Sequence, residues 1–430
     1  MLKQFPPRFG TADELKDLQN RGLKWTVEHA GNNSPFYRKQ FEAAGITPTD
    51  IRTIDDLEKL PFTTADDLRA GYPFPLLAVD PAEIVRIHSS SGTTGKRKIL
   101  SYTRNDIDDW SYMFGRCYEM AGVTRQDRVQ ICVGYGLWTA GAGFQLGCER
   151  YGAMAIPAGP GNLEMQTSLL VDMQSTVLCC TASMGLLLAE EVHRRNLKDK
   201  IALRKVILGA ERTSEAMIAV IREHLGVEEV YDIPGLTELY GPGTGLSCRC
   251  NSGIHYWADY YLLEILDPET LRPVNPGEIG EMVFTTLRKE GTPLVRYRSR
   301  DLTRLIDGDC PCGCGLPRHD KILGRSDDVV IFRGVNMYPG QVDEILSGIS
   351  GLGSEYQVIL DHQDDGKDSM AVKVERARDG APEDDERLGK AIVRAIKQAL
   401  FVSCTPEIVP NGSLPRSERK TARMFDNRKY

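Results

Sequence analysis

Short apolar runs alternate with amphipathic stretches over the first half of the chain. The runs RVQICVG, TVLCCT and RKVILGAE each precede a helical pattern, such as MGLLLAEEVHRRN after the second and SEAMIAVIREHLG after the third. A repeated strand–helix order is typical of a parallel sheet covered by helices. Near the start, TADELKDLQNRGLKWTVEHA has helical periodicity, and Thr11 and Glu14 have the spacing of a capping box. This half of the chain therefore predicts an α/β fold.

The pattern changes from about Tyr256 onward. The segments YYLLEIL, GEIGEMVFTTL and DLTRLI have the composition of strands, and Pro and Gly turns join them without intervening helices. Such connections predict an antiparallel layer or barrel.

The last hundred residues have a third pattern, in the order strand, helix, strand, strand, helix, strand. VVIFRG begins it, YPGQVDEILSGI and DERLGKAIVRAIKQAL are the helices, and a QDDGK turn separates the two middle strands. This order is that of a ferredoxin-like domain. The join lies near GRSDD, so we expect a large N-terminal domain over 1–325 and a small C-terminal α+β domain over 326–430.

Composition narrows the class of protein. The chain has 430 residues, of which 41% are hydrophobic and 26% charged, and its net charge is −7. Mixed charges with a small acidic excess argue against a nucleic-acid-binding protein. No apolar stretch has the length of a membrane span, and the first residues lack an apolar signal segment. We therefore expect a cytoplasmic protein with no membrane partner.

The segment HSSSGTTGKRK, from His88 to Lys98, is rich in hydroxyls and glycine and ends in cations. Backbone N–H groups, hydroxyls and a lysine in such a loop can surround phosphate oxygens. The Walker pattern fails here, because Ser90 replaces its first glycine and Arg97 its hydroxyl residue. A polar surface loop is the alternative.

The order S-S-G-T-T-G-K resembles the phosphate loop of the adenylate-forming enzymes, the acyl-CoA synthetase and ligase superfamily. Further segments are similar to that superfamily's motifs and follow in the same order. The resemblance places the following residues at ATP or AMP: Ser90, Ser91, Gly92, Thr93, Thr94, Gly95 and Lys96 in the loop, Gly209, Ala210 and Glu211 in LGAERTSE, Asp232 and Thr237 in YDIPGLTELYGPG, Asp301 in YRSRDLTRL, and Arg325 in GRSDDVVIFRGVNMYP.

The same resemblance implies roles for three more residues. Glu238 would hold Mg²⁺, Asp327 would be the hinge of the mobile domain, and Lys420 in NGSLPRSERKTARM would be the catalytic lysine. One departure is Pro234, which replaces the tyrosine that usually stacks on adenine. Either nucleotide affinity or selectivity differs as a result, or Tyr231 or Tyr240 takes over the stacking.

Within the superfamily the chain resembles the phenylacetate–CoA ligase group from about Leu18 to its C-terminus. The likeness implies activation of an aromatic carboxylic acid with ATP, Mg²⁺ and CoA, phenylacetate being the first candidate and indoleacetate or another arylacetate the alternatives. Tyr135, Trp138 and Gly235 are the expected substrate-pocket residues. An adenylyltransferase that acts on a deazaflavin, or a non-catalytic sensor, would be a rival. Dimers are common in the group, which leaves a homodimer open.

Two groups of cysteines predict a metal site. Cys248 and His255 lie in CRCNSGIH, and Cys310 and Cys312 form CPC. Three thiolates and one imidazole make a closed structural zinc site, and some members of the group carry such a zinc. Cys250 and Cys314 are alternative ligands, and unconnected thiols are the other interpretation.

Overall fold

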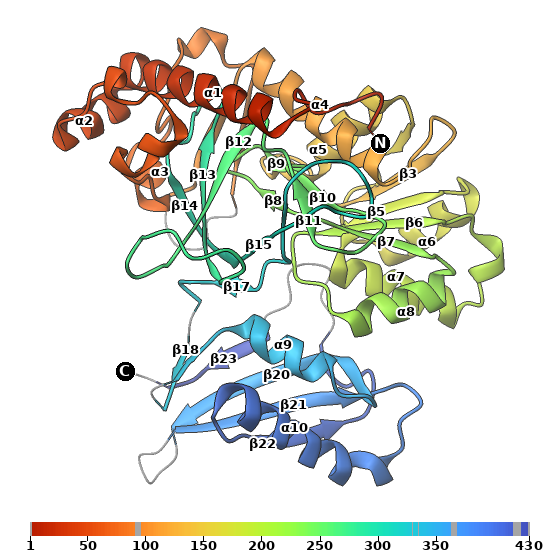
Figure 1. The fold of residues 1–430 in the computed structure, drawn as a ribbon. Helices are drawn as coiled ribbons and strands as arrows, with labels where there is room; N and C mark the ends of the chain where they lie inside the picture. The colour runs from red at the N-terminus through yellow and green to blue at the C-terminus, as the bar shows by residue number, and fades with distance from the viewer. Residues whose placement is uncertain are drawn as a thin grey trace.

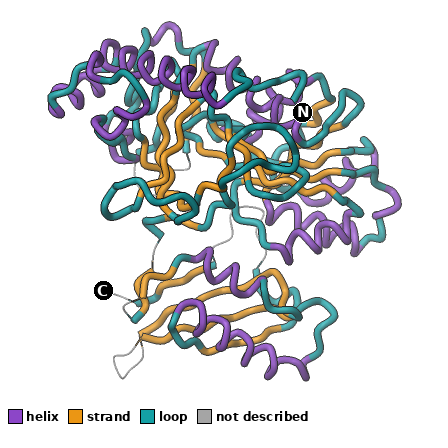
Figure 2. The backbone as a smooth tube through the Cα atoms, viewed as in Figure 1, coloured by secondary structure: helices purple, strands orange, loops and turns teal. Residues whose placement is uncertain are grey.

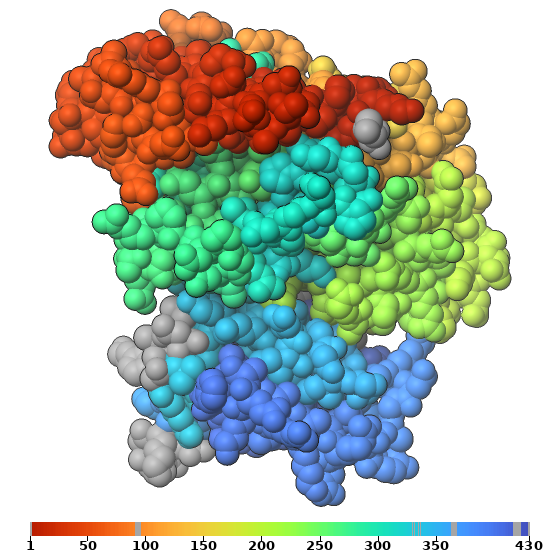
Figure 3. Space-filling view, viewed as in Figure 1, coloured from red at the N-terminus to blue at the C-terminus, as the bar shows by residue number. Residues whose placement is uncertain are grey.

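The computed structural model describes residues 2–90, 96–328, 330–333, 335–362, 368–415 and 423–428. A large unit carries the N-terminal helices and several sheets, and the C-terminal unit, drawn in blue, lies beneath it (Figure 1). The space-filling view shows the two units in contact along this boundary (Figure 3). Among the described residues, no helix is long and apolar enough to cross a membrane.

The α/β unit is a parallel sheet with the strand order β4-β3-β5-β6-β7. Alternate strand residues face opposite sides: Cys132 and Leu178 join the cluster of α6, α7 and α8, whereas Ile131 and Cys179 join that of α4 and α5. Helices therefore cover both faces, as predicted (Figure 2). The elements are α4 (Arg104–Met120), β3 (Arg128–Cys132), α5 (Thr139–Tyr151), β4 (Met154–Ile156), α6 (Leu163–Asp172), β5 (Val177–Thr181), α7 (Ala182–Arg194), η4 (Lys198–Lys200), β6 (Lys205–Gly209), α8 (Glu215–Leu225) and β7 (Glu229–Ile233).

The N-terminal helices cover the antiparallel part of the fold. Thr11 and Glu14 form the predicted capping box at the start of the first helix. Further along it, the Thr26 hydroxyl donates a 2.7 Å hydrogen bond to the carbonyl of Thr286. The helices are α1 (Ala12–Asn33), α2 (Pro35–Ala44), η1 (Pro48–Asp50), η2 (Ile54–Lys59), α3 (Ala65–Ala70) and η3 (Pro81–Glu83).

The predicted antiparallel layer is confirmed as two sheets with the orders β12-β13-β14-β17 and β10-β11-β16-β15. The first sheet carries the residues expected at the ribose, and the second brings the two cysteine groups together. Their strands are β10 (Gly245–Ser247), β11 (Ile254–Tyr256), β12 (Tyr261–Leu266), β13 (Gly280–Thr286), β14 (Tyr297–Thr303), β15 (Leu305–Ile306), β16 (Arg318–His319) and β17 (Gly324–Arg325).

The C-terminal unit is an α+β layer with its own apolar core. Its sheet has the order β22-β21-β20-β23, with β20 and β21 antiparallel and both outer strands parallel to their neighbours. The predicted first strand departs from the ferredoxin-like pattern, since it pairs in a hairpin with β19, and β23 occupies the place beside β20. The elements are β18 (Val330–Phe332), β19 (Val335–Met337), α9 (Pro339–Ser347), β20 (Leu352–His362), β21 (Asp368–Arg376), η5 (Pro382–Asp384), α10 (Asp385–Leu400), β22 (Thr405–Val409) and β23 (Met424–Asp426).

Candidate active site

The predicted phosphate loop connects two strands of a hairpin, β1 (Arg86–Ser89) and β2 (Ile99–Tyr102). Ser91, Gly92, Thr93, Thr94 and Gly95 lie outside the described residues. The backbone N–H of Ser89 donates a 2.8 Å hydrogen bond to the carbonyl of Leu137, and Nδ1 of His88 lies 3.2 Å from the same oxygen. The start of the loop is thereby fixed to the segment before α5.

Polar atoms at the entrance of this loop are available to a ligand. The hydroxyls of Ser89 and Ser90 are buried and have no hydrogen-bond partner among the described residues. Burial lowers the pKa of His88 to about 4, so its imidazole is neutral at pH 7. At the far end, the exposed ammonium of Lys96 lies 5.6 Å from the ring centroid of Tyr72. Unpartnered buried hydroxyls fit a site for an anionic ligand.

The predicted Mg²⁺ ligand meets the end of the phosphate hairpin. Glu238 is only 2% exposed and follows β8 (Gly235–Leu236), which pairs with β9 (Gly241–Pro242). Its carboxylate forms an ion pair with the ammonium of Lys98. Sequence reasoning missed Lys98, although its position two residues after the S-S-G-T-T-G-K motif was a usable signal. A buried carboxylate beside a phosphate loop fits a hard cation such as Mg²⁺.

Two further side chains that sequence reasoning missed hold the turn that carries Glu238. Lys289 donates hydrogen bonds of 2.9 and 2.6 Å to the carbonyls of Glu238 and Leu239. The sequence offered as a signal only a lysine flanked by the apolar runs of two predicted strands. The hydroxyl of Tyr102 lies 3.2 Å from the carbonyl of Thr237, whose own hydroxyl lies 3.4 Å from that of Thr139.

The predicted adenine-side turn follows β6. A Cβ at Gly209 would lie 2.7 Å from the carbonyl oxygen of Ile233, so only glycine permits this approach of β6 to β7. Ala210 has a φ of 70°, and Glu211 accepts hydrogen bonds from the N–H and hydroxyl of Ser183. The Glu211 carboxylate is therefore engaged at the first residues of α7.

Asp232 lies on β7 next to that turn. Its backbone N–H donates a 2.8 Å hydrogen bond to the hydroxyl of Ser247. The residue lines a cavity of about 120 Å³ together with Thr213 and Lys321. Burial raises the pKa of Asp232 to about 6. Its carboxyl group therefore titrates close to neutral pH.

Neither tyrosine proposed to replace the ring at Pro234 presents an exposed face. Tyr240 is fully buried, with the ammonium of Lys289 5.1 Å from its ring centroid. Tyr231 is 3% exposed, and its hydroxyl donates to the carboxylate of Glu229. The expectation that Tyr240 stacks on adenine is wrong for this arrangement, because its ring packs in the core, whereas Tyr231 lines the same cavity as Asp232 and its stacking stays a prediction.

The predicted ribose and hinge residues are in direct contact. Asp301 on β14 pairs with Arg325 on β17 in the sheet register. Nη1 of Arg325 lies 3.2 Å from a carboxylate oxygen of Asp301, and the same guanidinium binds Asp327. Two of the residues expected at the nucleotide are thus joined to the expected hinge.

The expected substrate-pocket residues lie on two segments that meet. The ring of Tyr135 packs against Gly141, and that of Trp138 against Gly134, where a Cβ would lie 2.8 Å from a ring carbon. The Tyr135 hydroxyl is buried without a partner among the described residues. Gly235 is exposed, and a Cβ there would lie 2.9 Å from Pro242.

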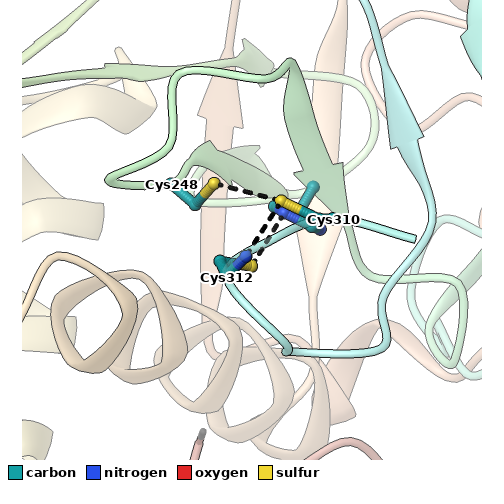
Figure 4. Close-up of side chains that lie close together, drawn as sticks. Cys248, Cys310 and Cys312 are labelled. Carbon is teal, nitrogen blue, oxygen red and sulfur yellow. Dashed lines mark hydrogen bonds between the residues drawn. The ribbon is translucent and has the colours of Figure 1, made fainter. Parts of the chain in front are cut away.

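The four predicted zinc ligands converge on the second antiparallel sheet. The ligand atoms of Cys248, His255, Cys310 and Cys312 all lie within 4.8 Å of one another. Figure 4 shows the three thiols facing one another. The sulfurs of Cys248 and Cys310 lie 3.5 Å apart. A tetrahedral zinc with Zn–S bonds of about 2.3 Å separates thiolate sulfurs by about 3.8 Å, so this donor set fits the ion.

The two alternative cysteines differ in position. Cys250 is exposed and is not part of the group, whereas the sulfur of Cys314 lies 3.2 Å from Nδ1 of His255. Since Nδ1 also lies 2.9 Å from the carbonyl of Leu316, Nε2 is the ring nitrogen that faces Cys312, at 3.4 Å.

The predicted catalytic residue Lys420 lies outside the described residues.

Two family models match the chain. One, described as AMP-binding enzyme, covers residues 24–287, and one described as AMP-binding enzyme C-terminal domain covers residues 334–428. The phenylacetate-coenzyme A ligase of Escherichia coli (strain K12) is 41% identical over 98% of this chain and 97% of its own length. That of Pseudomonas putida is 38% identical over 98% and 96%.

A solved structure of 2-hydroxyisobutyryl-CoA ligase in its postadenylation state, in complex with 2-HIB-AMP, is also similar. It is 26% identical, with a TM-score of 0.88 over 98% of this chain and 91% of that one. The same ligase in its thioesterification state, with 2-HIB-AMP and CoA, gives a TM-score of 0.71. The two scores refer to one protein in two states, and this chain superposes better on its postadenylation structure than on its thioesterification structure.

Proposed function

Because the chain belongs to the AMP-binding enzyme family and, within it, to the phenylacetate–coenzyme A ligases, we propose that it activates an arylacetic acid with ATP and CoA. The products are the acyl-CoA thioester, AMP and pyrophosphate, and phenylacetate is the first candidate acid. The observation that carries this proposal is the likeness, at 38–41% identity over nearly the full length, to relatives named phenylacetate-coenzyme A ligase.

The first step joins the acid to the nucleotide. A carboxylate oxygen attacks the α-phosphorus of ATP, the bond to the pyrophosphate oxygen breaks, and an acyl-adenylate and pyrophosphate result. The nucleophile is already anionic and needs no general base, so the task of the protein is to bring two anions together. Lys420 would bridge the carboxylate and the α-phosphate, and a unit-charge pair at 4 Å gains about 4 kcal/mol at an effective dielectric of 20.

The polyphosphate needs compensating charge. The loop hydroxyls, including the unpartnered groups of Ser89 and Ser90, would donate to phosphate oxygens. Glu238 would hold Mg²⁺, which supplies positive charge to the phosphates when it is bound. Lys98, which is paired with Glu238 in this structure, would then be released toward the phosphates. Fixed donors of this kind are often worth about 10²–10³ in rate.

The nucleoside would lie between the parallel sheet, which carries Asp232 on β7, and the antiparallel sheet that carries Asp301 on β14. Asp232 accepts from the adenine amine, Asp301 accepts from the ribose hydroxyls, and Arg325 lies beside the ribose. The proposal for Asp301 and Arg325 is supported by their contact at 3.2 Å in paired strands. The turn at Gly209, Ala210 and Glu211 would flank the adenine.

The second step releases AMP. The CoA thiolate attacks the acyl carbonyl, the bond to the AMP oxygen breaks, and the thiol proton leaves to solvent. We propose that residues 326–430 rotate about Asp327 between the steps, relative to residues 1–325, and withdraw Lys420. The contrast between the TM-scores of 0.88 and 0.71 with two states of one related ligase supports this movement.

We also propose a structural zinc ion held by Cys248, His255, Cys310 and Cys312. Its donor set is closed, with three thiolates and one imidazole, so zinc would brace the loop between β15 and β16 and take no part in the reaction.

A pyrophosphate-release assay with a panel of aryl and alkyl acids tests the function. Release that requires an arylacetic acid, followed by CoA consumption equal to AMP formation, is the expected result. Pyrophosphate release that needs a deazaflavin and consumes no CoA would instead identify an adenylyltransferase. For the mechanism, Lys420→Ala should abolish adenylate formation but leave CoA transfer to a supplied acyl-adenylate largely intact. Equal loss of both would contradict the assigned role.

A further inference from the structure

The turn over residues 237–240 presents four consecutive backbone carbonyls to two buried side chains. The ammonium of Lys289 donates to the carbonyls of Glu238 and Leu239. The hydroxyl of Tyr102 lies 3.2 Å from the carbonyls of Thr237 and Tyr240. We call Lys289 and Tyr102 the carbonyl cradle. It holds the backbone of the residue whose carboxylate faces the phosphate hairpin.

A fully buried lysine is costly unless its charge is compensated. Lys289 and Tyr102 are both 0% exposed, and the ammonium lies 4.7 Å from the Tyr102 ring centroid and 5.1 Å from that of Tyr240. Burial lowers the pKa of Lys289 to about 8, because it disfavours the charged ammonium. The carboxylates of Asp106 and Glu238 compensate the charge, together with the carbonyl dipoles and aromatic faces at the turn of the expected magnesium ligand.

The cradle also connects this turn to the phosphate hairpin. Tyr102 is the last residue of β2, the strand that leaves the loop. Next to Lys289, the Glu290 carboxylate accepts a 2.7 Å hydrogen bond from the hydroxyl of Thr103, which follows Tyr102. The two sides of the cradle are therefore fixed to each other.

We propose that Lys289 and Tyr102 are positioning residues for the adenylation step: they fix the backbone at Glu238 so that its carboxylate is in place to hold Mg²⁺ when Mg·ATP binds. This inference rests on the proposed ligase function. It implies selectivity between the two half-reactions, because acyl transfer from the adenylate to CoA does not use the metal-bound polyphosphate. A role in stability alone would lower both half-reactions by the same factor.

The test measures both half-reactions for Lys289→Met and Tyr102→Phe. Adenylate formation is followed by pyrophosphate release at varied Mg·ATP, and thioester formation by CoA consumption with supplied phenylacetyl-adenylate. We expect Lys289→Met to lower kcat/KM for Mg·ATP by at least tenfold and to leave thioester formation within about twofold of the wild type. Tyr102→Phe removes one hydroxyl and should give a smaller loss, again confined to adenylation.

Two control variants remove buried polar groups that lie away from the Glu238 turn, so they separate an effect at this turn from the general effect of losing such a group. Tyr118→Phe removes another fully buried hydroxyl that donates to a backbone carbonyl, that of Phe144. Lys205→Met removes another buried lysine, which pairs with Glu229 at the start of β7. Both controls should change the two half-reactions equally. Equal losses in both half-reactions for the cradle variants, or no loss in either, would overturn the proposal.

Misfolding of a variant and failure of the proposed function can both be told apart from failure of this inference. If Lys289→Met fails to fold, Tyr102→Phe decides the question by the same comparison. If the wild-type enzyme forms no adenylate from any acid of the panel, the proposed function fails, and the inference fails with it. A wild type that forms adenylate, with cradle variants that behave like their controls, contradicts the inference alone.

Discussion

The guanidinium of Arg325 binds the carboxylate of Asp327 through two hydrogen bonds of 2.9 Å each. The same group reaches Asp301 at 3.2 Å. A bidentate arginine–carboxylate pair fixes geometry as well as charge. The contact therefore links the expected ribose ligand to the expected hinge, and movement of the hinge would be coupled to the occupancy of the nucleotide site.

Arg325→Lys should weaken ATP binding without much effect on stability. Lysine keeps the charge but lacks the fork that spans Asp301 and Asp327. We expect the KM for ATP to rise about tenfold, which corresponds to about 1.4 kcal/mol. The Tm should fall little, because the Arg325 and Asp327 side chains are 39% and 50% exposed. Arg304→Lys, in the exposed pair with Asp320, is the control and should leave the KM unchanged.

Cys312→Ser should lower both zinc content and stability. The wild type should carry about one zinc per chain, and loss of a thiolate from a closed site weakens the binding of the ion. We expect the Tm to fall by at least about 5 °C, as a loss of about 2 kcal/mol would produce in a large domain. Metal analysis and thermal unfolding measure this. Cys250→Ser, at the exposed cysteine outside the group, is the control, and a metal-free wild type of equal stability would refute the site.

ATP use should weaken on acidification in a way that depends on Asp232. Its pKa is raised to about 6 by burial, so the carboxylate that would accept from adenine is lost as pH falls through 6. We expect kcat/KM for ATP to fall several-fold between pH 7 and pH 5. The side chain in Asp232→Asn does not titrate, whereas every other protonation, including that of ATP, is the same in this variant and in the wild type. The ratio of the two profiles should therefore show a midpoint near 6; a flat ratio would exclude Asp232.

Trp138→Phe should change the preference among aromatic acids. Trp138 packs against Gly134, and the next residue, Thr139, contacts the hydroxyl of Thr237. A smaller ring opens space, and such changes in an apolar pocket are worth about 1–3 kcal/mol. We expect kcat/KM for indoleacetate to rise about tenfold relative to phenylacetate, measured in competition. An unchanged ratio would place the acid elsewhere.

The sequence by itself determined the local features of this protein. Strand–helix alternation predicted the parallel sheet, because the period of apolar residues reports which face of each element is buried. The motif order led to the family, since each motif is a short segment whose backbone chemistry is local. The cysteine groups predicted a metal site for the same reason.

Only the tertiary structure decided which distant residues meet. Lys289 lies 51 residues from Glu238, and Cys310 lies 62 residues from Cys248, so their contacts depend on the path of the chain between them. The apolar runs on either side of Lys289 did not show which backbone its ammonium meets, and no local pattern showed that Tyr240 faces the core. The first strand of the C-terminal unit likewise pairs with its neighbour in a hairpin, because strand partners are chosen by packing across the whole domain and not by the strand's own composition.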